Sequence, residues 1–201
     1  MQSSNDRPKI VVAVTGASGS IYAVRFLRAV APLCERVDVI FSEPALTVHA
    51  TEMGDALRKP YTAEQYIGQA ASNIRFLGVR DFFTPPASGS YRHNGMVIIP
   101  CSMGTIGRIA SGVSDDLIAR SADVCLKERR KLILVPREAP YSLIHLRNMT
   151  ALTEAGATVL PASPSFYSNP QSIDDLVDTV VARVIQNLGL DQNIVGQWRE
   201  E

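Results

Sequence analysis

The chain is poor in cysteine, and its cysteines form no pattern. Cys34, Cys101 and Cys125 are scattered and odd in number, and no C-x-x-C pair occurs. A secreted disulfide scaffold needs an even set of regularly spaced cysteines, so this class is excluded. The composition predicts a reducing compartment, and we expect a cytoplasmic protein.

Excess charge and long apolar runs are also missing. Twenty basic residues balance twenty acidic residues, and the sequence pI is about 6.8. A neutral chain gives no electrostatic footprint for nucleic acid or for an anionic membrane. No apolar run approaches the roughly 18 residues of a membrane span, and the polar start does not resemble a signal peptide.

Metal-ligand motifs and internal repeats are absent from the sequence. His49, His93 and His145 do not have the spacing of metal ligands, so we expect no metal site. Without repeats or low-complexity segments, a chain of 201 residues is expected to form one domain. We expect flexible tails at residues 1–8 and about 190–201.

Short apolar runs alternate with helical patterns along the chain. The runs are typical of strands covered on both faces of a parallel sheet, and they lie at Lys9–Gly16, Arg36–Ser42, Gly95–Pro100, Lys131–Pro136 and 157–162. Helices are expected at 19–33, 44–53, 142–155 and 172–189, with one or two more in 104–130, interrupted near Gly112. Residues 54–95 are less regular. The alternation predicts an α/β fold, a Rossmann-like (flavodoxin-like) doubly wound parallel sheet in three layers, α/β/α.

Small and hydroxyl-bearing residues follow the first strand, where ligands of such sheets bind. In "TGASGS", the glycines allow close approach of a backbone, and the helix start with Ser18 and Ser20 offers donors to a phosphate. An ordinary tight turn explains the same residues, because neither G-x-G-x-x-G nor a Walker sequence is present. Both interpretations stay open on this motif alone.

Two further strand ends have the same character. Ser42 either caps the helix that Pro44 opens or meets a ribityl-type hydroxyl. "CSMGT" follows the strand Gly95–Pro100, and a second turn of this kind suggests a ligand with more than one polar region. Cys101 begins this turn, and we expect a buried, inert thiol there because no partner for a nucleophile lies at a diagnostic spacing.

A pair of opposite charges ends the strand Lys131–Pro136, in the sequence "VPREAPYS". Prolines on both sides stiffen the turn, and the strand before it is apolar. A surface ion pair would contribute little. We favour a functional pair, in which Glu138 acts as a general acid or base and Arg137 holds an anion or lowers the pKa of Glu138.

Further cations stand on predicted helix faces. Arg120 and Lys127 are seven residues apart and share one face, and Arg183 interrupts the apolar "VVARVI". Each of these cations, taken alone, is explained if its aliphatic part lies on apolar surface and its charged group stays in water. Together with Tyr167 they could form a second anion site.

Several of these segments resemble the UbiX family of flavin prenyltransferases, formerly named 3-octaprenyl-4-hydroxybenzoate carboxy-lyases. The resemblance rests on "TGASGSIYAVR", "PPASGS", "PCSMGT", "LKERRKLILVPREAP" and "SFYSNPQS…DLVDTVVARV", and it extends from about Lys9 to Gly189. It implies a single flavoprotein domain. It also implies metal-independent transfer of a dimethylallyl group from dimethylallyl monophosphate to N5 and C6 of reduced FMN, although some members accept the diphosphate. The product, prenylated FMN, serves a UbiD-type decarboxylase, and the family forms homododecamers with sites at subunit contacts.

The resemblance also implies residue roles. The catalytic residues would be Glu138, which would carry a proton together with the departing phosphate, and Ser18 and Glu52. The residues that hold FMN would be Gly16, Ala17, Ser18, Ser42, Ser102, Met103, Gly104, Thr105 and Arg137. The prenyl phosphate would be held by Arg120, Lys127, Tyr167 and Arg183. Trp198 would cover the site or a neighbouring subunit, or it would belong to a frayed tail.

This chain departs from the family pattern at three positions, and three alternative functions would need different residues. Phe82 and Phe83 stand where some members have tryptophan, and Met103 stands where others have a small residue or threonine. A flavin-dependent cysteine decarboxylase would need asparagines where this chain has Gly104 and Ala139. A decarboxylase of hydroxybenzoates would not need the second anion site, and a non-enzymatic flavin carrier would not need Glu138.

Overall fold

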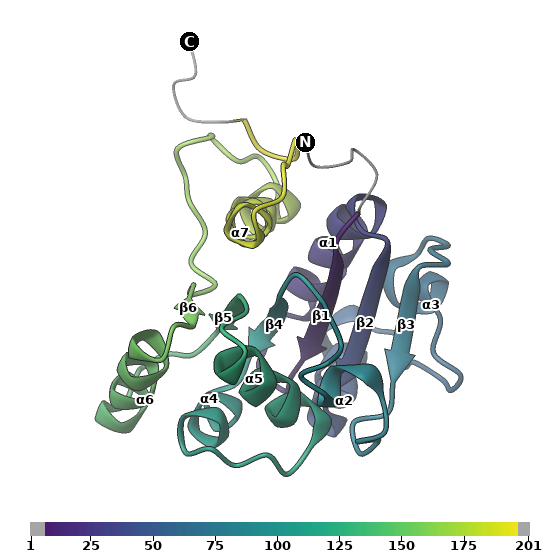
Figure 1. Ribbon diagram of the computed structural model, residues 1–201. Helices are drawn as coiled ribbons and strands as arrows, with labels where there is room; N and C mark the ends of the chain where they lie inside the picture. Colours follow the sequence, from purple (N-terminus) through teal and green to yellow (C-terminus); the bar gives the residue numbers. More distant parts are fainter. Residues whose placement is uncertain (1–6, 197–201) are drawn as a thin grey trace, which may run out of the picture.

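Six short strands form one parallel sheet in the computed structural model, which describes residues 7–196 (Figure 1). The strands are β1 (Lys9–Val14), β2 (Arg36–Phe41), β3 (Ile74–Leu77), β4 (Met96–Cys101), β5 (Leu132–Pro136) and β6 (Thr158–Val159). Their order is β3-β2-β1-β4-β5-β6, and all neighbours are parallel. The chain starts at the centre, runs to one edge and then crosses to β4. This is the Rossmann strand order, and it confirms the predicted doubly wound sheet.

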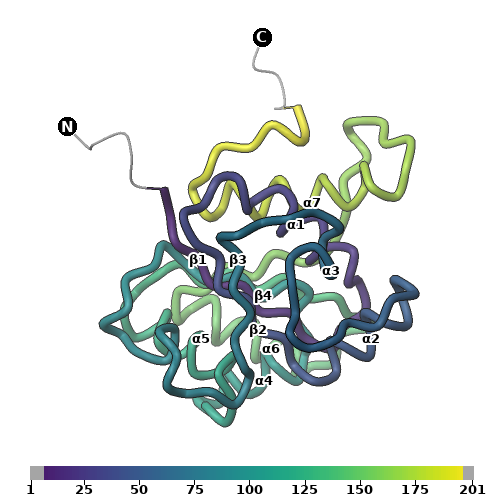
Figure 2. The backbone as a smooth tube through the Cα atoms, turned by 90° about the vertical axis from the view of Figure 1, so that its right-hand side faces the viewer, coloured from purple at the N-terminus to yellow at the C-terminus, as the bar shows by residue number. Residues whose placement is uncertain are grey.

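Helices cover both faces of the sheet, so the predicted three layers are present (Figures 1 and 2). Successive residues of a strand point to opposite faces. Val12 packs in the cluster with α1 (Ser20–Val30), α2 (Glu43–Met53), α3 (Ala63–Ile67) and α7 (Ile173–Leu188). Val11 packs in the cluster with α4 (Met103–Ala110), α5 (Leu117–Lys127) and α6 (Leu143–Glu154). Short 3-10 helices occupy Ala31–Leu33 and Pro85–Ala87.

The helix boundaries follow from capping residues. Ser172 caps α7 in a capping box with Asp175, as predicted for this serine. Gly112, with a left-handed φ of 69°, lies in the break between α4 and α5, where the sequence predicts an interruption. None of the described helices has the length and apolar character that a membrane crossing needs.

Two elements differ from the sequence-based expectation. The strand β3 and the helix α3 lie in the segment 54–95, which the sequence predicts to be less regular. Each element is short, and β3 carries the exposed Arg75. In the expected C-terminal tail, Leu190 and Ile194 pack against the core. Trp198, with its expected covering role or frayed tail, lies outside the described residues.

Candidate functional site

A cavity of about 600 Å³ lies at the carboxyl ends of β1, β2 and β4. Ligands of doubly wound sheets bind at this edge, where the strand order reverses. Five predicted flavin residues line the cavity, namely Gly16, Ser42, Ser102, Gly104 and Thr105. Six other lining residues are absent from the predicted flavin set, namely Glu43, Pro44, Val79, Arg80, Arg108 and Asp116.

A buried threonine joins two walls of the cavity. Thr15, directly after β1, donates its hydroxyl hydrogen to the carbonyl of Pro100 at 2.8 Å. The same oxygen accepts the backbone N–H of Ser102 at 2.8 Å. The turn after β4 is therefore held in place against the turn after β1.

Helix starts point at the cavity from two sides. The hydroxyl of Ser42 accepts the N–H of Ala45 at 3.3 Å, and the hydroxyl of Ser102 accepts the N–H of Thr105 at 3.3 Å. The capping predicted for Ser42 is confirmed, and Ser102 caps α4 in the same way. Because helix N-termini carry partial positive charge, the walls favour an anionic or strongly polar ligand group.

An arginine network supports the wall on the side of α5. The guanidinium of Arg108 forms ion pairs with Asp115 at 2.7 Å and with Asp116 at 2.6 Å. Burial opposes the charge of Arg108, but both carboxylates raise its pKa above its ordinary value. Asp116 also caps α5 by accepting the N–H of Ala119. Asp116 stands before an apolar helical run, so capping rules could have identified it as a helix start.

The glycine loop after β1 is packed against α2. A Cβ at Gly16 would lie 2.5 Å from the Cβ of Pro44, so only glycine fits there. Gly19 has a φ of 111°, in the left-handed region that glycine adopts readily. Close packing and turn geometry therefore account for these two glycines.

The amides at the start of α1 bind a carboxylate of the protein itself. The N–H of Gly19 donates to Glu52 at 3.0 Å, and the N–H of Ser20 donates to Glu52 at 2.8 Å. The donors proposed for a phosphate at this helix start are thus occupied by Glu52. Partial burial would raise the pKa of Glu52, but hydrogen bonds from Ser18, Ser20 and Gly19 outweigh this and lower its pKa.

The charged turn after β5 reaches the glycine loop. The Nε of Arg137 donates to the carbonyl of Ser18 at 3.1 Å, across 119 positions of sequence. The carboxylate of Glu138 is exposed and accepts the N–H of Ala139 at 3.1 Å. Arg137 and Glu138 form no ion pair with each other. The side chain of Arg137 therefore contacts the glycine loop, whereas the carboxylate of Glu138 is exposed to solvent.

The four residues predicted for a second anion site lie in two groups. On α5, Arg120 contacts the carbonyl of Ala87 at 3.0 Å, and Lys127 pairs with Glu128 at 2.6 Å. Beside α7, Tyr167 and Arg183 line another cavity of about 1000 Å³. Because α5 and α7 cover opposite faces of the sheet, one chain alone does not bring the four together. A second anion site made of all four residues therefore stays a prediction, and it would need more than one chain.

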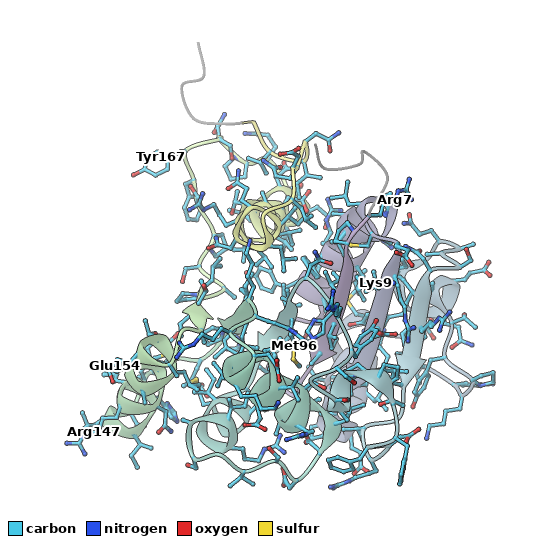
Figure 3. All side chains as sticks on the ribbon, in the orientation of Figure 1. Arg7, Lys9, Met96, Arg147, Glu154 and Tyr167 are labelled. Atoms are coloured by element: carbon cyan, nitrogen blue, oxygen red, sulfur yellow. The ribbon has the colours of Figure 1, made fainter. Side chains whose placement is uncertain are left out.

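Several large aromatic and apolar side chains are exposed to solvent. Tyr167 is 83% exposed and extends away from the sheet (Figure 3). Phe83 is fully exposed, and Leu143 and Ile144 at the start of α6 are largely exposed. Exposed apolar surface of this kind is typical of contact with another chain.

The thiol of Cys101 is unsuited to nucleophilic chemistry. It is fully buried, and burial raises its pKa well above the ordinary value of a thiol. The predicted burial of this thiol is confirmed, and a buried thiol with a raised pKa is expected to be inert. Among residues 7–196, no group of three or more His, Cys, Asp or Glu is arranged to hold a metal ion.

Comparison with known proteins relates this geometry to flavin chemistry. The family described as Flavoprotein matches residues 1–185. The flavin prenyltransferase UbiX of Pseudomonas aeruginosa is 48% identical over 198 residues, which is 96% of this chain and 95% of that protein. UbiX of Thermoplasma acidophilum is 44% identical over 190 residues, 94% of this chain and 99% of that protein.

Solved structures agree with the sequence relatives. AnUbiX (PadA1), in complex with FMN and dimethylallyl pyrophosphate, is 39% identical with a TM-score of 0.85, over 97% of this chain and 99% of that chain. A dodecameric FMN-dependent UbiX-like decarboxylase from Escherichia coli O157:H7 is 39% identical with a TM-score of 0.84, over 95% and 99%. Peptidyl-cysteine decarboxylase EpiD, at 17% identity and a TM-score of 0.58, shares the fold alone.

Proposed function

The chain belongs to the flavin prenyltransferase family of flavoproteins, and we propose that it transfers a dimethylallyl group from dimethylallyl monophosphate to N5 and C6 of reduced FMN. The observation that carries this proposal is 48% identity to a flavin prenyltransferase over 96% of the chain. The carbon–oxygen bond to the phosphate breaks as that carbon bonds to N5, which loses its proton. The double bond of the transferred group then takes up a proton, the resulting cationic carbon bonds to C6, and C6 loses its proton. The products are prenylated FMN and inorganic phosphate.

The cavity at the carboxyl edge fits the polar arm of FMN. The starts of α2 and α4 and the hydroxyls of Ser42, Ser102 and Thr105 supply the donors and the partial positive charge that such a group needs. A Cβ added at Gly104 would meet no neighbouring atom within 4 Å, so this wall leaves room for a ligand. Ala17, Ser18 and Met103 adjoin these walls, and Arg137 lies beside Ser18, where it would contact the ring system.

FMN supplies the nucleophilic atoms when it is bound, and the protein supplies proton transfer and anion stabilisation. Glu138, on a turn stiffened by prolines and joined to the glycine loop through Arg137, is the proposed proton carrier. Glu52 holds the start of α1 and keeps Ser18 in position by a hydrogen bond. Cations at the phosphate stabilise the leaving group without a metal ion.

Assembly would complete the prenyl phosphate site. Arg120 and Lys127 lie on one face of the sheet, and Tyr167 and Arg183 lie on the other. A second chain that packs on the exposed apolar residues could bring the two groups together. We therefore propose a homododecamer, which the dodecameric relative supports.

The proposed setting follows from the same chemistry. Prenylated FMN is a product for another enzyme, and we propose a UbiD-type decarboxylase as the recipient. The three cysteines are buried and unpaired, which supports a reducing, cytoplasmic environment. A decarboxylase of the cysteine type is disfavoured because Gly104 and Ala139 stand where that chemistry needs asparagines.

Release of phosphate tests the proposal. The protein is mixed without oxygen with FMN, dithionite and dimethylallyl monophosphate, and inorganic phosphate is measured. We expect release that requires reduced FMN and persists in EDTA. Release with oxidised FMN, or without flavin, would indicate a phosphatase and contradict the proposal.

A further inference from the structure

Basic side chains gather at the amino edge of the sheet, opposite the flavin cavity. This basic edge comprises seven of the twenty basic residues of the chain: Arg7, Lys9, Arg36, Arg75, Arg92, Arg130 and Lys131. Figure 3 shows Arg7 and Lys9 at the start of β1, far from Arg147 on α6. Because the chain is neutral overall, this gathering is a segregation of charge.

The strand register explains part of the gathering. Lys9 of β1 is paired with Arg36 of β2, and Asp38 of β2 is paired with Arg75 of β3. Side chains at paired positions point to the same face. Residues two apart on a strand do so as well. Three cations of three adjacent strands therefore share one face, around a single buried carboxylate.

Acidic residues form ion pairs with only two members of the basic edge, although the charge of Arg130 also acts on the carboxylate of Glu128. Lys9 pairs with Glu35 at 3.2 Å, and Arg36 pairs with the fully buried Asp38 at 2.8 Å. Within residues 7–196, no ion pair neutralises the others, Arg7, Arg75, Arg92, Arg130 and Lys131.

Two of these five charges are fixed in place by backbone carbonyls. Arg130 donates to the carbonyls of Tyr91 at 2.7 Å and Gly89 at 2.5 Å. Lys131 donates to the carbonyl of Leu188 at 2.8 Å. Carbonyl oxygens satisfy the donors but do not cancel the charge, so the edge remains electropositive.

The surface between these residues is a row of hollows. Three hollows of about 330, 330 and 510 Å³ all include Glu35, and adjoining ones share Lys9 or Arg7. The charges are thus spread over the starts of several strands and do not converge in one enclosed pocket. A ligand with an extended surface therefore matches this arrangement of charges better than a small anion does.

We propose that the basic edge docks an acidic surface of a partner protein. Charge complementarity of this kind steers association and fixes orientation. Glu35 at the centre of the hollows would repel a phosphodiester backbone but can accept a donor from a protein that carries mixed charges. Docking at this edge leaves the flavin cavity open at the opposite edge.

Binding of an acidic polypeptide tests the proposal. The assembled protein with FMN is titrated into fluorescein-labelled poly-L-glutamate, and anisotropy is followed at low and at physiological salt. We compare Arg75→Gln/Arg92→Gln with Arg58→Gln/Arg147→Gln, which removes equal charge elsewhere. We expect about tenfold weaker binding for the edge variant, less than twofold for the control, and weakening by salt.

Other outcomes overturn the proposal. Equal effects of the two variants, or no binding to the unmodified protein, would mean that the edge is not a docking surface. Tighter binding of DNA of equal length, lost in the edge variant, would assign the edge to nucleic acid. Dissociation of the assembly by the edge substitutions, measured by mass photometry, would make it a contact between copies of this chain. The melting temperatures of both variants are measured as well, so that unfolding can be excluded as the cause of weaker binding or of dissociation.

Discussion

Thr15 and Ser102 are joined by a hydrogen bond of 2.8 Å, although they follow different strands. The oxygen of Thr15 accepts the N–H of Ser102 while its hydrogen goes to the carbonyl of Pro100. This buried hydroxyl connects the turns after β1 and β4, which form two walls of the proposed flavin cavity. The relationship makes Thr15 a positioning residue for the cofactor site.

Replacement of Thr15 by valine tests this role. Thr15→Val keeps the shape but leaves a backbone N–H unpaired, so we expect a loss of about 1–3 kcal/mol in the free energy of unfolding and weaker FMN binding. Denaturant unfolding and a fluorescence titration of FMN measure the two effects. Thr15→Ser restores the hydroxyl and should recover both. FMN affinity unchanged in Thr15→Val would disprove the positioning role.

Glu52 predicts a dependence of stability on pH. Its pKa is lowered in the folded protein, so the unfolded chain binds protons more readily and the stabilisation is present above the ordinary carboxyl pKa. It is lost as the pH falls through the lowered pKa of the folded state. Glu52→Gln should therefore have a free energy of unfolding about 1 kcal/mol lower at pH 7, as is typical of a lost helix cap. Its melting temperature should fall accordingly. The difference from the unmodified protein should shrink in acid; a constant difference from pH 7 to strongly acidic solution would contradict this account.

Glu138→Gln separates chemistry from binding. The amide keeps the size of the side chain but cannot carry the proton, so we expect FMN affinity to be retained and turnover to fall by about 10²–10⁴-fold. Single-turnover kinetics with reduced FMN measure the loss. Ala139→Ser, the adjacent substitution, provides a control for disturbance of the turn. Unchanged turnover in Glu138→Gln would remove this residue from the mechanism.

Lys127 and its neighbour Glu128 give opposite expectations. Lys127→Met removes a cation from the proposed phosphate site and should raise the KM for dimethylallyl monophosphate by about 10–100-fold. Glu128→Gln removes the carboxylate that pairs with Lys127 in this structure and should leave the KM equal or lower. A rise in KM for both variants would show that the ion pair itself, and not the lysine alone, is needed.

The three cysteine thiols of the native protein should react only slowly with thiol reagents. Burial raises the pKa of Cys34 and Cys125 to about 12, and it raises the pKa of Cys101 further. A disulfide reagent at pH 8 should label the native protein very slowly and all three thiols after unfolding. Fast native labelling of one thiol would contradict the buried positions.

Local sequence patterns are sufficient to predict most of the fold. The runs that contain β1, β2, β4 and β5 are mostly apolar because these strands are covered on both faces. The strand β3 escapes prediction because it has only four residues and carries Arg75 on an exposed side. The strand-end rule predicts that the turns after β1, β2 and β4 lie together at one edge, and they line one cavity there. That this cavity binds the flavin stays a prediction.

Contacts between distant segments could not be predicted. Nothing local indicates that Glu52 binds amides 32 and 33 positions away. Likewise, a shared helix face correctly relates Arg120 to Lys127, but periodicity does not tell which face of the sheet a helix covers. Arg183 therefore could not be placed relative to them before the topology was known. The roles of the site residues stay predictions.

The mass of the flavin after reaction tests the central claim most directly. The purified protein is reduced with FMN in the absence of oxygen, dimethylallyl monophosphate is added, and the released flavin is analysed by mass spectrometry. The account predicts a gain of one C₅H₈ unit. Unaltered FMN with the monophosphate, and again with the diphosphate, would contradict prenyl transfer and leave a flavin-binding protein of another activity.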